Sequence, residues 1–243
     1  MSRILVTGST DGLGRATAES LLRNGHDVIV HARSSRRAES VADLVDQGAG
    51  LIIADLAVHD QVIAAAQQLE GGSPIDAVVH NAGVISGASV IPVNVVAPYL
   101  FAALLSRPVR HVFLSSSMHR SGSPGLGAVD WSGRTSSSSY SDSKLFVTAL
   151  SCALAAQWPQ VRSNAVDPGW VATKMGGAGA PDDFTLGHQT QEWLVTDPDT
   201  TVSGGYWFHR HQQAPHPSAT DSGFQAELLR TLSAATGVHL PRR

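Results

Sequence analysis

The sequence predicts a single α/β domain, residues 1–243, built as a doubly wound parallel sheet of about seven strands with helices on both faces. Two observations lead to this prediction. Short β-branched runs alternate with helical patterns through the first two thirds of the chain, and strands joined by helices pair in parallel. In addition, a length of 243 residues with 42% hydrophobic side chains is typical of one globular domain, or at most two.

The strands are predicted from short apolar runs that end at glycine or polar residues. In order, these runs are residues 3–7, 27–32, 51–54, 75–80, 111–115, 161–166 and 203–209. The helices between them are predicted from apolar residues at helical spacing. They cover residues 12–24, 36–47, 60–69, 93–106 and 140–157. Residues 176–200 are expected to form a mobile substrate loop and a short helix within the domain, because residues 176–183 are rich in glycine, alanine and proline.

Composition and charge exclude several classes of protein. The formal charge of −3 argues against nonspecific binding of nucleic acid, which needs a basic surface. No apolar run reaches the roughly 18 residues that a membrane span needs, and residues 1–7 do not resemble a secretory signal. The single Cys152 is compatible with a reducing compartment. We therefore expect a cytoplasmic protein.

A glycine motif follows the first predicted strand, at residues 7–14 (TGSTDGLG). Gly8, Gly12 and Gly14 allow a tight turn in which the backbone approaches a pyrophosphate at the N-terminus of the next helix. This position is typical of a Rossmann-type dinucleotide site. An ordinary strand-to-helix turn would contain the same glycines, so the motif alone leaves both interpretations open.

A tyrosine and a lysine, Tyr140 and Lys144, lie four positions apart at the start of the last long helix. Residues at this spacing share one face of a helix. A nearby ammonium stabilises a phenolate, so Lys144 is expected to lower the pKa of Tyr140 for acid–base chemistry. The chain has only two lysines, Lys144 and Lys174, against fifteen arginines, which indicates that this position needs a compact charge. The alternative is a chance helical pair.

Polar residues or glycine follow several of the predicted strands. They are Asn81–Gly83 after the fourth strand, Ser115–Ser117 after the fifth and Pro168–Gly169 after the sixth. The carboxyl ends of parallel strands line the ligand crevice of such sheets. These segments are therefore expected to meet the glycine turn at one crevice.

Taken together, these motifs resemble the short-chain dehydrogenase/reductase family, in its short single-domain type, over nearly the whole chain. The resemblance is carried, in family order, by Thr7-Gly8, Gly12-Leu13-Gly14, Asp55-Leu56, Asn81-Ala82-Gly83, Asn94, Ser116, Tyr140, Lys144 and Pro168-Gly169. Within the family the chain is similar to the retinol-dehydrogenase-like branch, through Ser116 with Met118-His119 and through residues 167–173 and 203–208.

The resemblance implies an NAD(P)-dependent oxidoreductase that transfers hydride between a nicotinamide cofactor and an alcohol or carbonyl substrate. It implies that Tyr140 donates the proton and that Ser116 polarises the carbonyl. Lys144 would also hold the nicotinamide ribose, and Asn94 would support a water-linked proton relay to it.

The resemblance also implies a set of cofactor-binding residues. In the glycine turn these are Gly8, Ser9, Thr10, Gly12, Leu13 and Gly14, and after the second strand they are Arg33 and Ser34. Asp55 and Leu56 would flank the adenine, and Asn81 and Ala82 the adjoining ribose, with Gly83 next to them. The set is completed by Tyr140 and Lys144, by Pro168 and Gly169, and by Val171 and Thr173 at the carboxamide.

The end of the second predicted strand favours NADP over NAD. Ala32 stands where NAD-binding sites have an acidic residue, and Arg33 follows it, where an arginine accommodates a 2′-phosphate. Arg15 and Arg37 are expected to add positive potential. Asp11 acts in the opposite direction, since phosphate-preferring relatives often have a basic residue at its place. NAD is the alternative cofactor.

No metal site is expected. The histidines at positions 119, 188, 209, 211 and 216 lack the spacing of metal ligands and are expected at the surface. His119 and Trp170 are also candidates for the substrate pocket, whereas Trp207 and Phe208 are expected to pack in the sheet core.

The predicted helices at residues 93–105 and 145–156 are apolar around much of their circumference. They predict either a homo-oligomer or coverage by the C-terminal segment. Two other functions use the same fold: a dinucleotide-binding regulatory protein with little or no turnover, and a structural oligomer subunit. The presence of Ser116, Tyr140 and Lys144 together argues against the regulatory protein.

Overall fold

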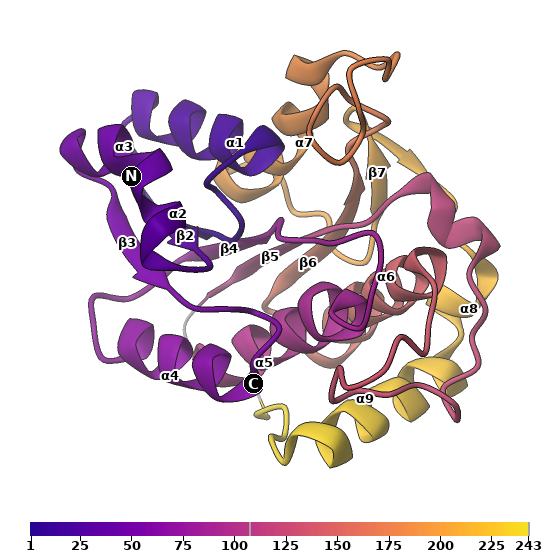
Figure 1. The fold of residues 1–243 in the computed structure, drawn as a ribbon. Coiled ribbons are helices and arrows are strands. Elements are labelled where there is room, and N and C mark those ends of the chain that lie inside the picture. The colour runs from indigo at the N-terminus through magenta and orange to yellow at the C-terminus, as the bar shows by residue number, and fades with distance from the viewer. Residues whose placement is uncertain (107, 243) are drawn as a thin grey trace.

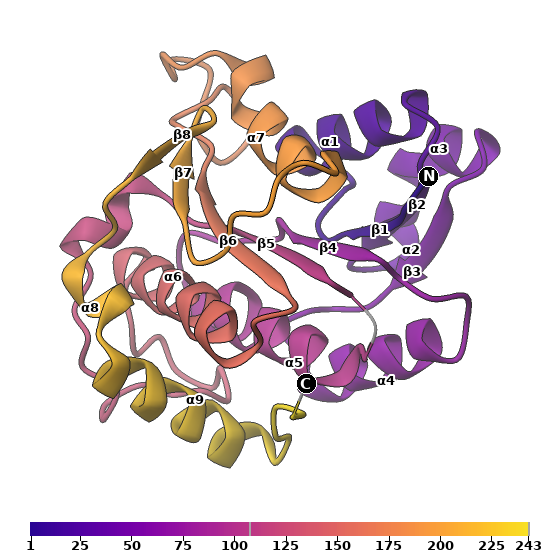
Figure 2. The same cartoon turned by 180° about the vertical axis from the view of Figure 1, so that it is seen from behind.

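The computed structural model describes residues 1–106 and 108–242, which form a sheet between two groups of helices (Figure 1, Figure 2). The strand order is β3-β2-β1-β4-β5-β6-β7-β8, and all neighbours are parallel except β7 and β8. The strands are β1 (Arg3–Val6), β2 (Asp27–Ala32), β3 (Gly50–Ile53), β4 (Ala77–His80), β5 (Arg110–Leu114), β6 (Arg162–Asp167), β7 (Tyr206–Phe208) and β8 (His211–Gln213). The predicted doubly wound parallel sheet is confirmed.

The antiparallel strand β8 is the one strand without a prediction. The turn that joins it to β7 consists of His209 and Arg210, whose φ angles are 48° and 63°. Two-residue hairpins with both residues at positive φ usually contain asparagine or glycine. Because neither is present, nothing in the sequence marks this hairpin.

The predicted helices are present, with differences at three places, and the two helices after β8 were not predicted. They are α1 (Gly12–Arg23), α2 (Ser35–Ala38), α3 (Ala42–Asp46), α4 (His59–Glu70), α5 (Ala97–Leu104), α6 (Tyr140–Gln157), α7 (Phe184–Thr196), α8 (Pro217–Thr220) and α9 (Ser222–Thr236). The predicted helix 36–47 is interrupted by a 3-10 turn between α2 and α3. The predicted helix 93–106 begins as a π-helical turn, Pro92–Val96, that continues into α5. Within residues 176–200 the helix α7 has 13 residues.

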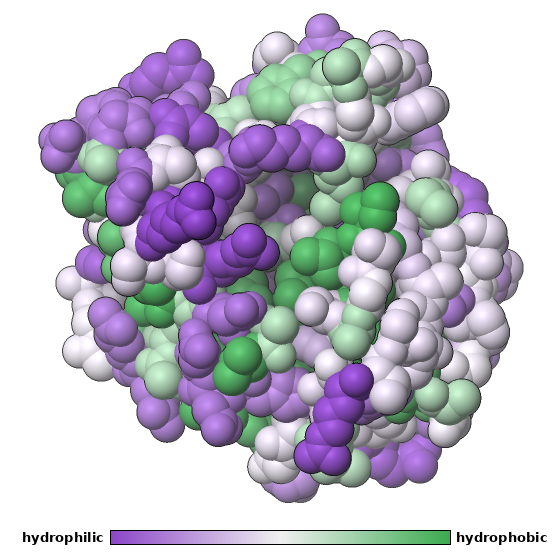
Figure 3. Space-filling model, viewed as in Figure 1, coloured by the Kyte–Doolittle hydropathy of each residue, from purple (hydrophilic) through white to green (hydrophobic). Residues whose placement is uncertain are grey.

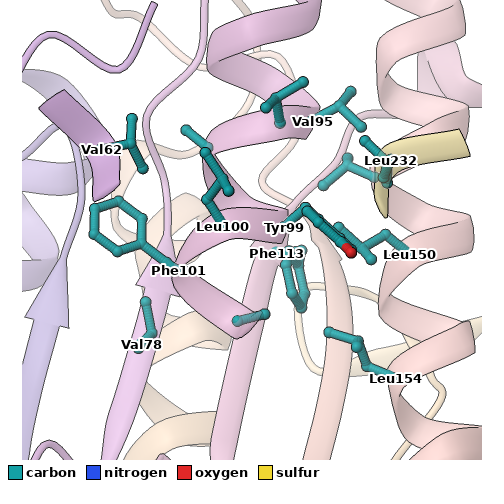
Figure 4. Close-up of a cluster of buried hydrophobic side chains, with 14 of the residues drawn as sticks. Val62, Val78, Val95, Tyr99, Leu100, Phe101, Phe113, Leu150, Leu154 and Leu232 are labelled. Carbon is teal, nitrogen blue, oxygen red and sulfur yellow. The ribbon is translucent and has the colours of Figure 1, made fainter. Parts of the chain in front are cut away.

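The two faces of the sheet are covered by different helices. Helices α1, α3 and α7 pack on one face, and α4, α5, α6 and α9 pack on the other (Figure 1). The larger core lies under the second group. Figure 4 shows it, with Phe113 of β5 beneath Tyr99 of α5 and Leu150 of α6. This core fixes α6 against the carboxyl ends of β5 and β6.

The C-terminal segment covers the apolar faces of α5 and α6. Phe224, Leu228 and Leu232 of α9 are buried in the larger core. Beyond α9, the Tyr99 hydroxyl donates to the Val238 carbonyl oxygen at 2.7 Å, and Trp158 Nε1 donates to the Pro241 carbonyl oxygen at 3.0 Å. Of the two alternatives for these apolar helices, the structure shows coverage by the C-terminal segment. In the described part of the chain, no helix combines the length and the apolar character that crossing a membrane requires.

Candidate active site

A first cavity of about 550 Å³ opens at the carboxyl ends of the strands, where the order reverses between β1 and β4. Its walls come from the β1–α1 turn, the ends of β2 and β4, the start of α6 and the segment after β6. The predicted residues that line it are Gly8, Thr10, Gly12, Leu13, Gly14, Arg33, Asn81, Ala82, Gly83, Tyr140, Lys144, Pro168 and Thr173. The expected crevice is thus formed by the expected segments.

The glycine turn is fitted closely to the end of β4. Gly8 has a φ of +66°, and a Cβ there would lie 2.8 Å from Ala82 Cα. A Cβ on Gly14 would lie 2.2 Å from Asn81 Nδ2, an atom that donates to the Thr7 carbonyl oxygen at 2.8 Å. Asn81 therefore holds the turn open, and side chains are excluded where the backbone borders the cavity.

A buried histidine of β2 supports the same turn. The Gly8 amide donates to His31 Nδ1 at 2.9 Å, so His31 Nε2 carries the proton and donates to the Ala54 carbonyl oxygen at 2.9 Å. Burial lowers the pKa of His31, which keeps this neutral tautomer. His31 also lines the first cavity. Its role was not predicted, since no motif distinguishes it from an ordinary strand residue.

Four charged side chains border one end of the first cavity: Asp11, Arg33, Arg37 and Lys174. Asp11 forms an ion pair with Lys174 and lies 3.5 Å from the Arg37 guanidinium. The hydrogen bond from Lys174 lowers the pKa of Asp11. Arg37 also donates to Thr10 Oγ1 at 2.9 Å. The single negative charge of Asp11 is outnumbered by the three positive charges of Arg33, Arg37 and Lys174. This end of the cavity therefore carries a net positive charge.

A second cavity of about 530 Å³ adjoins the first at Tyr140 and Pro168, which line both. Its hydroxyl-bearing lining residues are Ser115, Ser116, Ser117, Tyr140 and Thr173. The exposed large apolar side chains in its wall are Ile85, Met118, Trp170 and Met175, and Leu13 and Val171 also line it. Figure 3 shows a hollow in this face of the molecule, with hydrophilic side chains on one side and hydrophobic ones on the other.

Tyr140 is the first residue of α6, and the local sequence fixes where the helix begins. The Ser139 hydroxyl accepts from the Asp142 amide at 3.0 Å, and the Asp142 carboxylate accepts from the Ser139 amide at 2.9 Å. This reciprocal pair is a capping box, which satisfies amides that a helix start leaves unpaired. As predicted, Tyr140 and Lys144 share one face, with Lys144 Nζ 5.3 Å from the centroid of the Tyr140 ring.

The charge states of this pair differ from the expectation. Burial raises the pKa of Tyr140 to about 12, and a hydrogen bond with Ser116 acts in the opposite direction. Burial also lowers the pKa of Lys144 to about 8, against the attraction of Asp167. Lys144 is not among the groups that shift the Tyr140 pKa, which is set mainly by removal of the phenol from water. Tyr140 is held in its protonated form, the form that an acid requires.

Ser116 and Ser115 have separate roles. The Ser115 hydroxyl is buried and bonds to Thr148 Oγ1 at 2.7 Å, so it braces β5 against α6. The Ser116 hydroxyl accepts from the Met118 amide at 3.3 Å, and Ser116 lines the second cavity. The Ser116 hydroxyl also forms a hydrogen bond with Tyr140, so the two hydroxyl groups lie together at this cavity.

A buried acid and a second tyrosine stand behind the pair, and no motif predicted them as a group. Asp167 accepts from the Tyr206 hydroxyl at 3.0 Å and from the Gly169 amide at 3.0 Å. Burial first and then Asp167 raise the pKa of Tyr206. The Asp167 charge also raises the pKa of Lys144, so it favours the protonated ammonium. Asp167 thus partly offsets the cost of burying Lys144.

Asn94 lies in the π-helical turn and is buried. Its amide nitrogen donates to the Ser143 hydroxyl and to the Val84 carbonyl oxygen, both at 2.9 Å, and its amide oxygen accepts from the Val84 amide at 2.9 Å. A Cβ on Gly83 would lie 3.5 Å from Asn94 Oδ1 and 3.6 Å from Lys144 Nζ. The absent side chain of Gly83 thus leaves a gap between Asn94 and Lys144.

The remaining predicted residues lie around the cavities in other ways. Gly169 and Val171 line the second cavity rather than the first. Ser9, Ser34, Asp55 and Leu56 are not among the described residues that line either cavity. Ser9 Oγ instead joins β1 to β2, Ser34 caps α2, the Asp55 carboxylate accepts from the Ala57 amide, and Leu56 is buried in the core. Arg15 pairs with Glu19 and Asp43, outside the first cavity.

Two of the histidines expected at the surface are buried, His119 and His188. The His216 amide donates to His119 Nε2 at 3.0 Å, so His119 Nδ1 carries the proton and donates to the Ser116 carbonyl oxygen at 2.7 Å. His119 therefore supports the Ser116 backbone and is not among the described residues of the second cavity, whereas Trp170 lines that cavity. No group of three metal-ligating side chains occurs in the described residues.

Known proteins with similar sequences and folds match this description. A family model for short chain dehydrogenases matches residues 2–110. The chain is 34% identical over 257 residues to the short-chain dehydrogenase chyC of Penicillium rubens, covering 99% of this chain and 100% of the relative. It is 26% identical to retinol dehydrogenase 13 of Homo sapiens, covering 98% and 85%. A short chain dehydrogenase of Shigella flexneri, crystallised with NADP, has the same fold, with a TM-score of 0.70 and 24% identity over 86% of this chain and 97% of that chain.

Proposed function

Because the chain belongs to the short-chain dehydrogenase/reductase family, we propose that it is an NADP-preferring oxidoreductase that acts on an alcohol or carbonyl substrate. The observation that carries this proposal is the position of Tyr140. It lies where two cavities meet, one suited to a dinucleotide and the other to a small molecule, with Ser116 and Lys144 beside it. A binding protein without turnover has no need of a half-buried acid at this junction.

The first cavity fits a dinucleotide. Gly8 and Gly14 leave no side chain between the backbone and the cavity, and α1 begins at Gly12 with its N-terminus at the cavity wall. Helix N-termini favour phosphate groups. The diphosphate would lie at this turn, and Lys144 would hold the nicotinamide ribose.

The positive end of this cavity supports the preference for NADP. Arg33 is exposed and makes no ion pair within the described part of the chain, so its guanidinium is available to a 2′-phosphate. Asp11 would repel that phosphate, but Lys174 pairs with Asp11. We therefore assign Lys174 a supporting role in cofactor choice. The Shigella flexneri protein, which has this fold, was crystallised with NADP.

The bound cofactor would supply the hydride. Ser116 would donate a hydrogen bond to the carbonyl oxygen, and Tyr140 would give its proton to that oxygen as negative charge develops on it. Lys144, whose proton is retained at neutral pH, would stabilise the phenolate that Tyr140 becomes. Asn94, through its contacts at Ser143 and Val84, would support the return of a proton to Lys144.

A panel of carbonyl compounds and alcohols, assayed with NADPH and NADH for reduction and with both oxidised forms for oxidation, tests this function. We expect turnover of at least one compound, with a higher kcat/KM for the phosphorylated cofactor. Binding of both dinucleotides without turnover of any compound would instead indicate the regulatory protein. Absence of dinucleotide binding would indicate a structural subunit.

Three further predictions accompany the proposal. We propose no affinity for nucleic acid, on the basis of the formal charge of −3, and a cytoplasmic location, with which the single Cys152 is compatible. The homo-oligomer also stays a prediction, and sedimentation at micromolar concentration tests it. A single species of 25.5 kDa would reject it.

A further inference from the structure

The second cavity combines hydroxyl groups at one end with an uncharged wall elsewhere. Its described lining residues include no acidic, basic or histidine side chain. Tyr140 lines both cavities, and Ser116, which is hydrogen-bonded to it, lines the second. A substrate with a carboxylate or ammonium would therefore lose its hydration without gaining a partner of opposite charge.

Exposed apolar side chains gather at this cavity. Eleven large hydrophobic side chains are exposed in the described part of the chain, and four of them line the second cavity. They come from three separate segments, with Ile85 after β4, Met118 after β5, and Trp170 and Met175 after β6. Such convergence of apolar side chains in a concave wall is typical of a ligand pocket.

Trp170 is exposed and yet fixed. Its side chain is 61% exposed, the most of the four. Its indole Nε1 donates to the Gly176 carbonyl oxygen at 2.8 Å, and its amide donates to Asp182 Oδ2 at 2.6 Å. A Cβ on Gly176 would lie 3.3 Å from Trp170 Cδ1, so the loop closes tightly on the indole edge. The ring is thus held as a platform at the cavity wall.

The two thioethers suit the same kind of ligand. Methionine side chains are adaptable, and their sulfur atoms make favourable contacts with the edges of aromatic rings. Indole faces prefer to stack on other ring systems. With Met118 and Met175 lining the cavity along with Trp170, the wall favours a flat aromatic group over a flexible alkyl chain, because ordering a flexible chain has a larger entropic cost.

Building on the proposed function, we infer that the substrate is a neutral aromatic ketone, or the corresponding secondary alcohol, whose ring lies against Trp170. In the reducing direction the carbonyl carbon gains a hydride, with two electrons, from the reduced nicotinamide. The carbon–oxygen π bond opens, and the oxygen takes the proton of Tyr140 to give the alcohol. The nicotinamide leaves oxidised, and solvent returns the proton to the enzyme.

The test compares four ketones with the native protein and NADPH. They are acetylnaphthalene, its ring-carboxylated analogue, a linear methyl ketone of the same carbon number, and butanedione as a small ketone that does not reach the wall. We expect kcat/KM for acetylnaphthalene to exceed that of the linear and carboxylated ketones by roughly 10-fold.

Substitutions at Trp170 distinguish the contribution of an aromatic ring to substrate use from that of an apolar side chain. Trp170→Leu keeps an apolar side chain and should lower kcat/KM for acetylnaphthalene by roughly 10-fold and that for butanedione by much less, whereas Trp170→Phe should restore most of the loss. Leu186→Ala, an exposed apolar residue of α7 away from both cavities, is the matched control. NADPH binding by each variant checks that it is folded.

The outcomes distinguish the two proposals. Absence of turnover of all four ketones by the native protein would count against the proposed function, and with it this inference, whereas turnover of the linear or carboxylated ketone without acetylnaphthalene would overturn this inference alone. Turnover of butanedione together with equal or better use of the linear or carboxylated ketone would overturn the aromatic substrate alone. Equal losses of acetylnaphthalene kcat/KM in Trp170→Leu and Trp170→Phe would also overturn the aromatic substrate alone.

Discussion

The two cavities that meet at Tyr140 have walls of different origin. The first is bordered by the β1–α1 turn and the strand ends, where Gly14 and Asn81 approach closely, and by four charged side chains at one end. The second is bordered by loop side chains such as Met118 and Trp170, and its described lining carries no charged group. The first cavity is thus suited to a charged ligand that many proteins bind, such as a dinucleotide. The second is suited to a neutral ligand that is specific to this protein. The predictions below test this separation.

The largest effect is expected at the junction of the cavities. Tyr140→Phe keeps the ring and removes only the hydroxyl, so turnover should fall by at least about 100-fold, the usual contribution of a positioned acid. NADPH affinity, measured by fluorescence titration, should be nearly unchanged. Turnover close to that of the native protein would exclude Tyr140 as the acid.

The next largest effect concerns the first cavity alone. Arg33→Ala should weaken NADPH binding by roughly 10- to 150-fold, the range for a charge-assisted hydrogen bond, and leave NADH binding nearly unchanged. Ala32→Asp should move the preference towards NADH, because a carboxylate accepts from the 2′-hydroxyl and repels a phosphate. Titration of both reduced cofactors gives the result. If the native protein binds NADH more tightly, the NADP preference is wrong and the oxidoreductase stands.

The pH dependence of reduction should follow Lys144. Burial lowers its pKa to about 8, so its cationic form is present at neutral pH and is lost as the pH rises through about 8. We expect kcat/KM for reduction to fall about 10-fold per pH unit above that value. Lys144→Ala should lose this phase and also weaken cofactor binding. A profile that is flat from pH 7 to 10 would contradict the assignment.

The smallest effect tests the link between Lys174 and Asp11. Lys174→Met leaves the Asp11 carboxylate facing the 2′-phosphate end, and NADPH affinity should fall about 1.5- to 5-fold, in keeping with an exposed ion pair. NADH affinity serves as the internal control. Adding Asp11→Asn should restore the loss. If the double variant binds NADPH no better than Lys174→Met, then Lys174 acts by another route.

The sequence predicts the first cavity far better than the second. The crevice follows from the order of strands and from short motifs such as Asn81–Gly83, because a dinucleotide imposes the same backbone requirements wherever it binds. The wall of the second cavity has no such requirement. Trp170 could be proposed as a pocket residue, but Ile85, Met118 and Met175 come together only through the fold.

Other differences have local physical causes. The β7–β8 hairpin escaped prediction because His209 and Arg210 adopt positive φ without glycine. His119 was expected at the surface because it lacks metal-ligand spacing, with the substrate pocket as an alternative, yet its ring bonds to the backbone of Ser116 and of the distant His216. The pKa of Tyr140 depends mainly on burial. The spacing of Tyr140 and Lys144 in the sequence gives no information about that burial.

The covering of α5 and α6 by the C-terminal segment has a consequence for folding kinetics. The bond from Tyr99 to Val238 joins residues 139 positions apart, and that from Trp158 to Pro241 spans 83. Such nonlocal contacts form late, since closing long loops has a large entropic cost. During synthesis, the helix that carries Tyr140 and Lys144 would leave the ribosome with an uncovered apolar face, and its packing is completed only when α9 docks. Acquisition of activity should therefore coincide with this last step.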